Sequence, residues 1–392
     1  MKILILGCDG YIGYPLTLHL LEKGHEVLGV DNFSRRRRVS EFGSDSLTPI
    51  LSVDERKKYL TQGYTNFRGL VNLSLGVDTY GYIKSVLADF RPDAVVHLAE
   101  MPSAPWSMID AVHAGRTQFE NVIGTLDLLW GMREECPEAH LVKLGTMGEY
   151  GTPNCIIPEG YIPRQCNESR LTDRDCPMAG LQFPRDAGSF YHLSKVHDTH
   201  NIIFACKTWG LTSTDIMQGV LFGLNYEDED IPLENMTRFD YDESFGTVIN
   251  RFCVQAIIEH PLTVYGSGNQ IRGFLPLKDS IQCLTLAIDH PPNPGTYRVF
   301  NQFESVYKIS SLAALVCHEA SKLGLEVAAL NRANPRSEAQ THYYNPVHKK
   351  LFDLGYIPTT DIKAEINLLL SQLLPFKGKV NKDVILPHIK WR

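Results

Sequence analysis

Short apolar runs alternate with amphipathic stretches over the first 220 residues of the chain. The apolar runs have the pattern of strands, and the stretches between them have the pattern of helices. This alternation predicts an α/β fold, a doubly wound parallel sheet that binds its ligands at the carboxyl ends of the strands. The expected strands are Lys2–Leu6, Glu26–Asp31, Asn66–Val71, Ala94–Ala99, Leu141–Thr146 and Thr212–Gly219. The expected helices lie near Tyr11–Lys23, Tyr80–Phe90, Thr117–Glu134 and Ser189–Trp209.

Three segments interrupt the alternation: Val39–Gly63, Pro153–Gly188 and Leu224–Phe245. The last two are rich in Pro, Asp, Glu and Asn, and we expect loops or lids over a site there. From about Leu221 the pattern becomes irregular, as expected of a smaller α+β domain that binds substrate. We therefore expect a first domain over residues 1–220, with inserted loops at 39–63 and 153–188. A second domain is expected over residues 221–392, and segments near 271–303 are expected to return to the first domain.

Composition excludes several classes of protein. A hydrophobic content of 43% and a charged content of 21% suit a chain that buries a sizeable core, which excludes wholesale disorder. A net charge of −7 argues against a partner that is nucleic acid or an anionic membrane. No apolar run reaches the roughly 20 residues of a membrane span. The opening run MKILILG is too short for a signal peptide, so we expect a cytoplasmic protein.

The nine cysteines include no CxxC pair, and their odd number fits a reducing compartment. We expect ordinary reduced thiols and no metal site. Cys155, Cys166 and Cys176 fall close together in a Pro-rich loop, which leaves a local metal or redox role as the alternative.

A glycine-rich loop, Gly7–Gly13 (GCDGYIG), follows the first expected strand and opens a helix. In this spacing one glycine makes the tight turn, one lets a pyrophosphate approach the backbone and one packs the helix against the strand. The start of the helix then offers free N–H groups and a positive dipole end to the phosphates. Asp31 ends the second strand, where a carboxylate bonds the hydroxyls of the adenosine ribose and repels a 2′-phosphate. The first domain is therefore predicted to be a Rossmann domain that binds NAD.

Four arginines, Arg35 to Arg38, come directly after this strand. Their position suggests that Arg35 and Arg36 line the adenine edge by stacking or reach a phosphate. A solvated loop and a nucleic-acid patch are the alternatives, and an acidic chain supports neither well. Basic residues at this place could also recruit a 2′-phosphate, which keeps NADP open as the alternative cofactor.

Tyr191 and Lys195 form a YxxxK motif at the start of an expected helix. Four residues advance a helix by about 6 Å and return to the same face, so the ammonium lies beside the phenol and depresses its pKa. The phenolate can then take a proton from a substrate hydroxyl while a hydride leaves the same carbon for nicotinamide. Thr146, at the end of the fifth strand, supplies a hydroxyl to this edge of the sheet. The alternative is a pair on a helix surface.

The glycine loop, the strand-end Thr146 and YxxxK, in this order, resemble the extended short-chain dehydrogenase/reductase family, and Asn121–Thr125 (NVIGT) resembles another of its motifs. Val264–Gly268 (VYGSG) with Arg272–Phe274 (RGF) resembles the diphosphate-binding stretch of members that act on nucleotide sugars. The resemblance implies that Arg272 and Arg336 clamp a UDP diphosphate, since guanidinium forks fit phosphate oxygens. The alternative for Arg336 is a surface charge in a loop.

The turn Thr146–Gly151 (TMGEYG) departs from the TDEVYG turn of 4,6-dehydratases in this family. Met147 and Gly148 occupy the positions of the dehydratase acid and base, and a carboxylate, Glu149, appears one residue later. This departure argues against a standard 4,6-dehydratase.

Longer stretches resemble one branch of the family, the UDP-sulfoquinovose synthases. They include Val142–Asn154, Phe190–Asn201, Phe239–His260, Pro261–Phe274 and Val299–Phe303, with departures at Met101–Pro102, Gly69–Asp78 and Pro153–Gly188. The resemblance implies a reaction in four steps. Bound NAD oxidises UDP-glucose at C4, and the C6 hydroxyl is then eliminated to give an enone. Sulfite next adds at C6, and the hydride finally returns to C4. NAD is then a bound catalyst that is not consumed.

The resemblance also implies roles for individual residues. Tyr191 is the base, Lys195 tunes it and Thr146 bonds the O4 hydrogen. Glu149 is the candidate for proton transfer at C5 or C6, and the alternative is that it caps a loop. His192 contacts O6 or steers the anion, and the alternative is a packed neutral imidazole. The implied cofactor contacts are Gly7, Gly10, Tyr11, Ile12, Gly13, Asp31, Asn32, Ser34, Arg35, Arg36, Leu98, Asn121, Tyr191, Lys195, Gln218 and Val220. The implied substrate contacts are Ser103, Thr146, Gln218, Asn250, Arg251, Thr263, Val264, Tyr265, Arg272 and Arg336.

The expected partners are UDP-glucose, sulfite and further copies of the chain in a homodimer or larger homo-oligomer, with no nucleic acid and no membrane. Two rival functions stay open. One is a UDP-glucose 4-epimerase-like enzyme without the sulfite step. The other is a non-catalytic NAD-sensing protein, which the intact set of Thr146, Tyr191 and Lys195 disfavours because a sensor needs no activated phenol.

Overall fold

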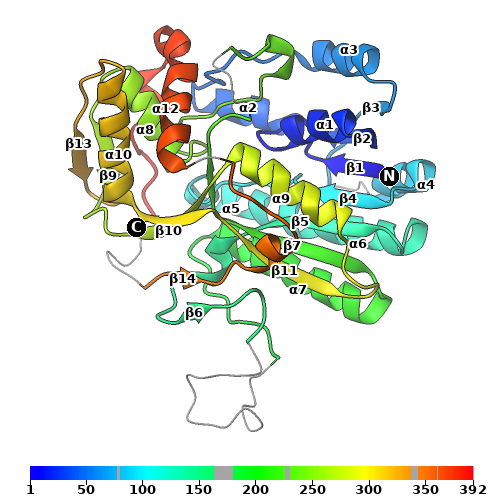
Figure 1. Cartoon of the computed structure of the whole chain (residues 1–392). Coiled ribbons are helices and arrows are strands. Elements are labelled where there is room, and N and C mark those ends of the chain that lie inside the picture. The colour runs from blue at the N-terminus through cyan, green and yellow to red at the C-terminus, as the bar shows by residue number, and fades with distance from the viewer. Residues whose placement is uncertain (77–79, 163–179, 226–229, 337–342, 360, 392) are drawn as a thin grey trace, which may run out of the picture.

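The computed structural model describes residues 1–76, 80–162, 180–225, 230–336, 343–359 and 361–391. At its centre lies a seven-stranded sheet in the order β11-β7-β5-β4-β1-β2-β3, in which every neighbouring pair is parallel (Figure 1). The predicted α/β fold with a doubly wound parallel sheet is confirmed. The strands are β1 (Lys2–Leu6), β2 (Glu26–Asp31), β3 (Phe67–Asn72), β4 (Ala94–His97), β5 (His140–Thr146), β7 (Thr212–Gln218) and β11 (Tyr297–Gln302).

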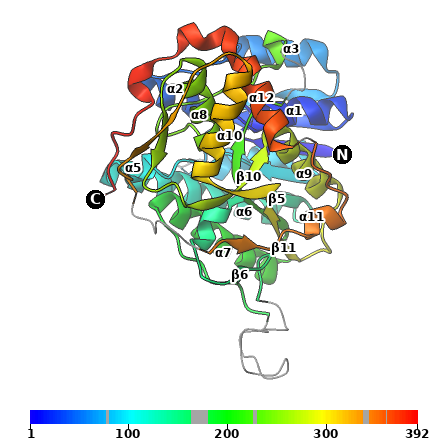
Figure 2. The ribbon, with the colours of Figure 1, turned by 60° about the vertical axis from the view of Figure 1, so that its left-hand side comes forward.

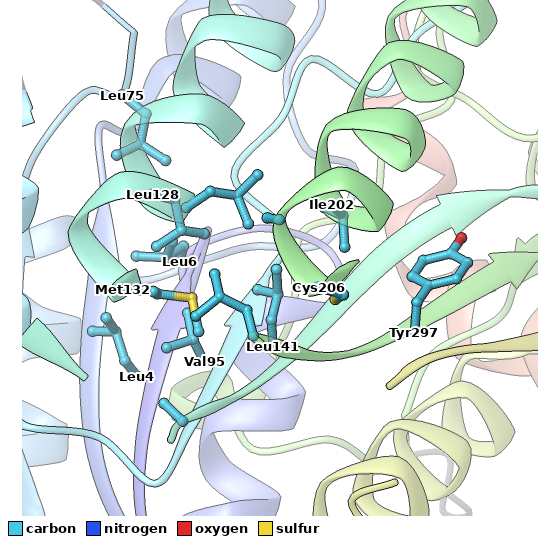
Figure 3. Packing of buried hydrophobic residues seen from close by; sticks show 14 of the residues in the cluster. Leu4, Leu6, Leu75, Val95, Leu128, Met132, Leu141, Ile202, Cys206 and Tyr297 are labelled. Atoms are coloured by element: carbon cyan, nitrogen blue, oxygen red, sulfur yellow. The ribbon is translucent and has the colours of Figure 1, made fainter. Parts of the chain in front are cut away.

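Helices cover both faces of this sheet (Figure 1). Side chains of α1 (Gly13–Glu22) and α9 (Leu277–Asp289) share one apolar cluster with one face of the strands. Side chains of α4 (Tyr80–Phe90), α6 (Gly124–Glu135) and α7 (Phe190–Trp209) share another with the opposite face. Figure 3 shows part of the second cluster, in which Leu128 and Met132 of α6 lie over strand residues such as Leu4 and Val95.

One helix lies within the segment 39–63, where the sequence analysis expected an inserted loop, and another ends at its start. Within the interruption at 39–63, α3 (Val53–Gly63) begins at a capping box, in which Ser52 accepts a hydrogen bond from the Glu55 N–H and the Glu55 side chain bonds the Ser52 N–H. The arginine run lies on a second helix, α2 (Ser34–Glu41). The S-x-x-E spacing of Ser52 and Glu55 is a sequence signal for the start of α3, and the sequence analysis overlooked it.

The single helix expected over Thr117–Glu134 is divided in the structure. A π-helical turn, Phe119–Ile123, separates α5 (Ala111–Gln118) from α6. The turn brings the Asn121 side chain to Met101, where it accepts a hydrogen bond from the Met101 N–H at 2.7 Å. A π-helical turn widens a helix at the point where a side chain is needed inward.

The second part of the molecule is built mainly from residues after Val220. Helices α8 (Val248–Ile257), α10 (Ile309–Lys322) and α12 (Ile362–Leu373) pack on one another around a third apolar cluster (Figure 2). A three-stranded sheet, β12-β10-β8, lies beside them. Its strands are β8 (Val220–Phe222), β10 (Ile271–Pro276) and β12 (Ser305–Lys308), and the remaining short elements are β9 (Leu262–Tyr265), β13 (Ala329–Arg332), β6 (Ile156–Ile157), β14 (Asn345–Pro346) and α11 (Lys350–Asp353).

Of the expected loop Pro153–Gly188, the structure describes both ends. Strand β6 pairs with β14, and Tyr161 and Gln182 form an isolated bridge. Cys166 and Cys176 lie outside the described residues, and Cys155 is half-buried. Among the helices that the structure describes, we find none with the length and apolar content that a membrane crossing requires.

Candidate active site

A cavity of about 800 Å³ lies at the carboxyl ends of the central strands and is lined by both parts of the molecule. Loops after β1, β2, β4, β5 and β7 form its walls on one side, and residues 243–248 and 263–273 contribute from the other. This volume is within the range of cofactor and ligand sites. The position agrees with the expectation that a doubly wound sheet binds its ligands at the carboxyl edge.

The glycine loop forms a cradle that leaves no room for side chains. A Cβ on Gly7, whose φ is +88°, would lie 2.8 Å from the Leu98 carbonyl carbon, and a Cβ on Gly13 would lie 2.0 Å from the Gly7 carbonyl oxygen. Helix α1 begins at Gly13, so its first N–H groups point at the cavity wall that these glycines form. The cradle therefore fits the pyrophosphate of a dinucleotide.

Asp31 stands at the end of β2, on the wall of the same cavity. Its carboxylate accepts hydrogen bonds from the Asp9 N–H at 2.8 Å and the Phe33 N–H at 2.7 Å. Burial raises its pKa, and the Asp9 carboxylate adds to this effect. The two backbone bonds fix the carboxylate on the cavity wall. The ribose contact that the sequence analysis expected of it stays a prediction.

Every arginine of the run on α2 has a partner within the chain. Arg36 forms two hydrogen bonds to the Asp9 carboxylate, at 2.7 and 2.8 Å. Arg35 lies 3.4 Å from the Asp240 carboxylate and stacks over the Phe245 ring, while Arg38 bonds Glu120 at 2.5 Å. Arg37 donates to the Asn32 carbonyl oxygen at 3.0 Å. Arg35 lines the cavity, whereas the structure does not bring Arg36 to it, because Asp9 holds that guanidinium.

The predicted Tyr-Lys pair lies on the first turns of α7, and both residues line the cavity. Lys195 Nζ donates to the Leu144 carbonyl oxygen at 2.7 Å and lies 5.9 Å from the centre of the Tyr191 ring. Burial raises the pKa of Tyr191, while the Lys143 ammonium and a hydrogen bond with Thr146 act in the opposite direction. Lys143, on β5, is thus a group near the phenol that the sequence analysis missed.

Glu149 does not line the cavity. It is fully buried behind the turn after β5, where it accepts a hydrogen bond from Thr199 at 3.1 Å and lies 3.7 Å from Lys143 Nζ and 3.6 Å from Arg185 Nε. Its other contact is the Thr146 N–H at 3.4 Å, as part of a capping box. Burial raises the pKa of Glu149 to about 7. In this position the carboxylate acts as the loop cap that was the alternative to proton transfer.

His192 lines the cavity, and its imidazole lies against Gly148. A Cβ on Gly148 would be 2.3 Å from His192 Nε2. Nδ1 lies 3.1 Å from Ser189 Oγ, which also accepts the His192 N–H at the start of α7. Burial, together with the charges of Arg336 and Arg272, lowers the pKa of His192 to about 3, so the ring is neutral. The imidazole thus occupies the space beside the position where a dehydratase carries its carboxylate.

The structure divides the other predicted contact residues into two groups. Those that line the cavity are Gly10, Tyr11, Ile12, Asn32, Ser34, Leu98, Ser103, Gln218, Val220, Arg251, Thr263, Tyr265, Arg272 and Arg336. Three residues lie behind the lining: Asn250 bonds the Gly223 N–H at 3.0 Å, Asn121 bonds Ser194 at 2.8 Å, and Val264 is part of an apolar cluster.

Glu100 was missed by the sequence analysis. It follows β4, lines the cavity and contacts the ammonium of Lys195, and its side chain is 2% exposed. The available signal was a carboxylate at the end of the apolar run AVVHLAE, on the edge of the sheet where function was expected.

Comparisons with known proteins agree with this geometry. Residues 3–170 match the model of the NAD dependent epimerase/dehydratase family. The chain is 45% identical over its whole length to the chloroplastic UDP-sulfoquinovose synthase of Spinacia oleracea, of which it covers 79%, and 45% identical to the UDP-sulfoquinovose synthase of Sulfolobus acidocaldarius, of which it covers 98%.

Solved structures show the same fold at low sequence identity. The UDP-glucose 4-epimerase of Thermotoga maritima, solved with UDP-glucose, superposes with a TM-score of 0.69 at 19% identity, over 95% of this chain and 98% of that one. The Thermus thermophilus enzyme, in complex with NAD, gives 0.63 at 20% identity, over 97% and 100%. Taken with the glycine cradle and the Tyr-Lys pair, the full-length matches show that the chain belongs to the UDP-sulfoquinovose synthase branch of the NAD dependent epimerase/dehydratase family.

Proposed function

We propose that this protein is a UDP-sulfoquinovose synthase, which converts UDP-glucose and sulfite to UDP-sulfoquinovose and water with NAD as a bound cofactor. The observation that carries the proposal is the composition of the cavity at the carboxyl edge of the sheet. It joins the glycine cradle to Thr146, Tyr191, Lys195 and the neutral His192. The expected NAD fits the cradle and the fixed carboxylate of Asp31.

The first step is oxidation at C4 of the glucose. The Tyr191 phenolate takes the proton of the C4 hydroxyl, and the Thr146 hydroxyl bonds the reacting oxygens. NAD, held by the glycine cradle and Asp31, would supply the acceptor for the C4 hydride and the donor for the final reduction. The positive charge of Lys143 lowers the pKa of the phenol and so opposes the effect of burial. We assign Lys195, whose Nζ lies 5.9 Å from the centre of the Tyr191 ring, the same stabilising role.

The second step removes the C5 proton, which the new ketone has acidified. We assign this proton to His192 Nε2, because the ring is neutral, lines the cavity and is held through Nδ1 by Ser189. The C6–O bond breaks, the leaving hydroxyl takes the proton from His192 Nε2 to form water, and a C5=C6 double bond forms in conjugation with the ketone. The sulfur lone pair of sulfite then forms the C6–S bond, C5 regains a proton from solvent, and the C4 ketone is reduced.

Three further residues have roles outside proton transfer. Arg272 and Arg336 line the cavity, and we assign them to the diphosphate of the UDP-sugar. Glu149 was expected to transfer a proton at C5 or C6, but its burial behind the turn after β5 keeps it from the sugar. We assign it instead to holding the turn that presents Thr146.

An apolar face on the π-helical turn, α6 and α7 supports the expected homo-oligomer. Its exposed side chains include aromatic rings, which occur at subunit interfaces. We propose that two copies of the chain associate through this face, whose residues are Phe119, Ile123, Trp130, Phe190, Leu193 and Phe204.

Purified protein mixed with UDP-glucose and sulfite tests the proposed activity. The expected product has the mass of UDP-sulfoquinovose, forms without net consumption of NAD, keeps a deuterium label at C4 and exchanges a label at C5 with solvent. Accumulation of UDP-galactose with the C5 label fully retained would instead identify an epimerase. Absence of any reaction, with NAD bound, would favour the sensor.

A further inference from the structure

Glu100 is a buried carboxylate in the cavity that the proposed steps leave unused. Its side chain is 2% exposed, and neither of its oxygens has a hydrogen-bond partner of ordinary geometry among the described residues. The Lys195 ammonium contacts Oε2, and His97 Nε2 lies 3.8 Å from Oε1. A carboxylate in such a place is costly unless a positive charge compensates it.

Lys195 is the group that supplies this charge. Burial lowers the pKa of His97 to about 3, so its imidazole is neutral. The Lys195 side chain is itself only 4% exposed. The two buried charges therefore compensate each other, and each would be destabilised by loss of the other.

We propose that Glu100 is a positioning residue for the C4 oxidation: its carboxylate holds the Lys195 ammonium in place and in its charged form beside Tyr191. The inference rests on the oxidation step of the proposed function and does not depend on sulfite. Glu100 acts through Lys195, because the ammonium is the group that it contacts.

Other charged groups face Lys195 from the elements around it. Asp198 on α7 and Asp215 on β7 raise its pKa, but burial has the larger effect and lowers it to about 8. Lys143 on β5 lies 3.8 Å from Asp215, and the charges of Lys143 and Lys195 both act to lower the pKa of Asp198, so the two ammonium groups share these carboxylates. Glu100, on the loop after β4, is in direct contact with Lys195. We therefore expect removal of the Glu100 charge to change the pKa of Lys195 more than removal of the Asp198 or Asp215 charge would.

The sign of the effect follows from this arrangement. Without the carboxylate, the charged form of the buried amine loses its compensating charge, so the ammonium gives up its proton at a lower pH. The neutral amine stabilises the phenolate less well, and the alkaline limb of the oxidation rate moves to lower pH. An opposite charge in contact changes a pKa by about 1–3 units, which sets the expected size of the movement.

The test is the substitution Glu100→Gln, which keeps the shape of the side chain and removes its charge. UDP-glucose is added without sulfite to the protein with its bound NAD, and the rate of NADH absorbance change is followed against pH. We expect the alkaline limb to move down by about one pH unit or more, kcat to fall more than KM rises, and Glu100→Asp to restore the limb. Glu319→Gln is the matched control, because Glu319 is a buried carboxylate paired with Lys322 on α10, away from the cavity, and its profile should equal that of the wild type.

A second measurement needs no turnover. The pH dependence of Lys195 labelling by an amine-reactive probe, read from peptide masses, reports the pKa of this lysine directly, and Glu100→Gln should lower it. Unchanged labelling and an unchanged alkaline limb would overturn the proposal, as would an equal movement in Glu100→Asp. If the wild type oxidises UDP-glucose but incorporates no sulfite, the proposed function fails at its later step while the role of Glu100 stands.

Discussion

At the scale of single residues, the Tyr191 phenol lies in a buried and highly charged region. Burial raises its pKa, and the charges of Lys143 and Glu149 act on it in opposite directions. The Glu149 carboxylate is shared among Lys143, Arg185 and Thr199, so it is held by three partners and does not reach the cavity. A reactive phenol that is buried needs such a balanced set of fixed charges behind it.

Gly148→Ala tests the contact between the turn after β5 and the His192 ring. A Cβ at this position would lie 2.3 Å from Nε2, so the imidazole must move away from its present place. We expect exchange of the C5 proton to slow by roughly 10²-fold or more, while C4 oxidation slows less. The measurement is deuterium exchange at C5 beside the rate of NADH formation.

Two comparison variants sharpen this experiment. Gly81→Ala, on α4, places its Cβ where no neighbouring atom lies within 4 Å and should change neither rate. Tyr191→Phe should stop C4 oxidation and C5 exchange together, by roughly 10²–10⁴-fold. Equal slowing of both steps in Gly148→Ala would contradict the assignment of His192 to the C5 proton alone.

At the scale of elements, each strand end brings one functional group to the carboxyl edge of the sheet. Asp31 ends β2, Glu100 follows β4 and Thr146 ends β5. The opposite ends of the same strands carry buried groups with structural roles. His140 begins β5, bonds Thr214 Oγ1 at 2.8 Å and lies far along the strand from Thr146.

His140→Gln is expected to reduce the loss of stability in acid. Burial lowers the pKa of His140 to about 3, whereas the unfolded chain binds the proton near the ordinary histidine value of about 6.5. The stability associated with the neutral ring is thus present above that value and is lost as the pH falls toward 3, at up to about 1.4 kcal/mol per pH unit. The free energy of unfolding, measured by urea titrations between pH 7 and pH 4, should fall less steeply with decreasing pH in the variant than in the wild type. The expected difference in slope is up to about 1.4 kcal/mol per pH unit. Parallel curves would show that His140 is protonated in the folded protein.

At the scale of the whole molecule, the site exists only where the two parts meet. Tyr11 of the glycine loop donates to the Gly223 carbonyl oxygen at 2.5 Å, and Arg56 of α3 reaches the Met236 carbonyl oxygen at 2.9 Å. Arg35 reaches Asp240 in the same way. These contacts tie the dinucleotide cradle to the part that carries Arg272, so both walls of the cavity are fixed together.

The identity of the cofactor follows from the partners of the four α2 arginines and from the charge of Asp31. All four arginines of α2 are engaged within the chain, and Asp31 faces the cavity with its negative charge. We expect protein denatured after purification to release NAD or NADH, in close to one equivalent per chain, by chromatography of the supernatant. Release of NADP would overturn the role given to Asp31.

The sequence by itself determined six of the seven strands of the central sheet, all but β11, and also the glycine loop and the Tyr191–Lys195 pair. Each of these depends on residues that are close in the chain and follow the period of one strand or one helix. It also placed Asp31 and Thr146 correctly, since the carboxyl end of a parallel strand is defined by where its apolar run stops. It failed at α3, where the capping box of Ser52 was overlooked, and at the division of the helix at Phe119–Ile123.

Only the tertiary structure decided which charges face the cavity. Arg36 and Glu149 lie one or two residues from groups that do line it, yet Asp9 holds the first and Lys143, Arg185 and Thr199 hold the second in the interior. Glu100 and Lys195 are 95 positions apart, and their contact depends on the packing of α7 against the loop after β4. Buried charges are placed by partners that are distant in the chain, because desolvation is offset only where an opposite charge or a hydrogen bond is brought to them by the fold.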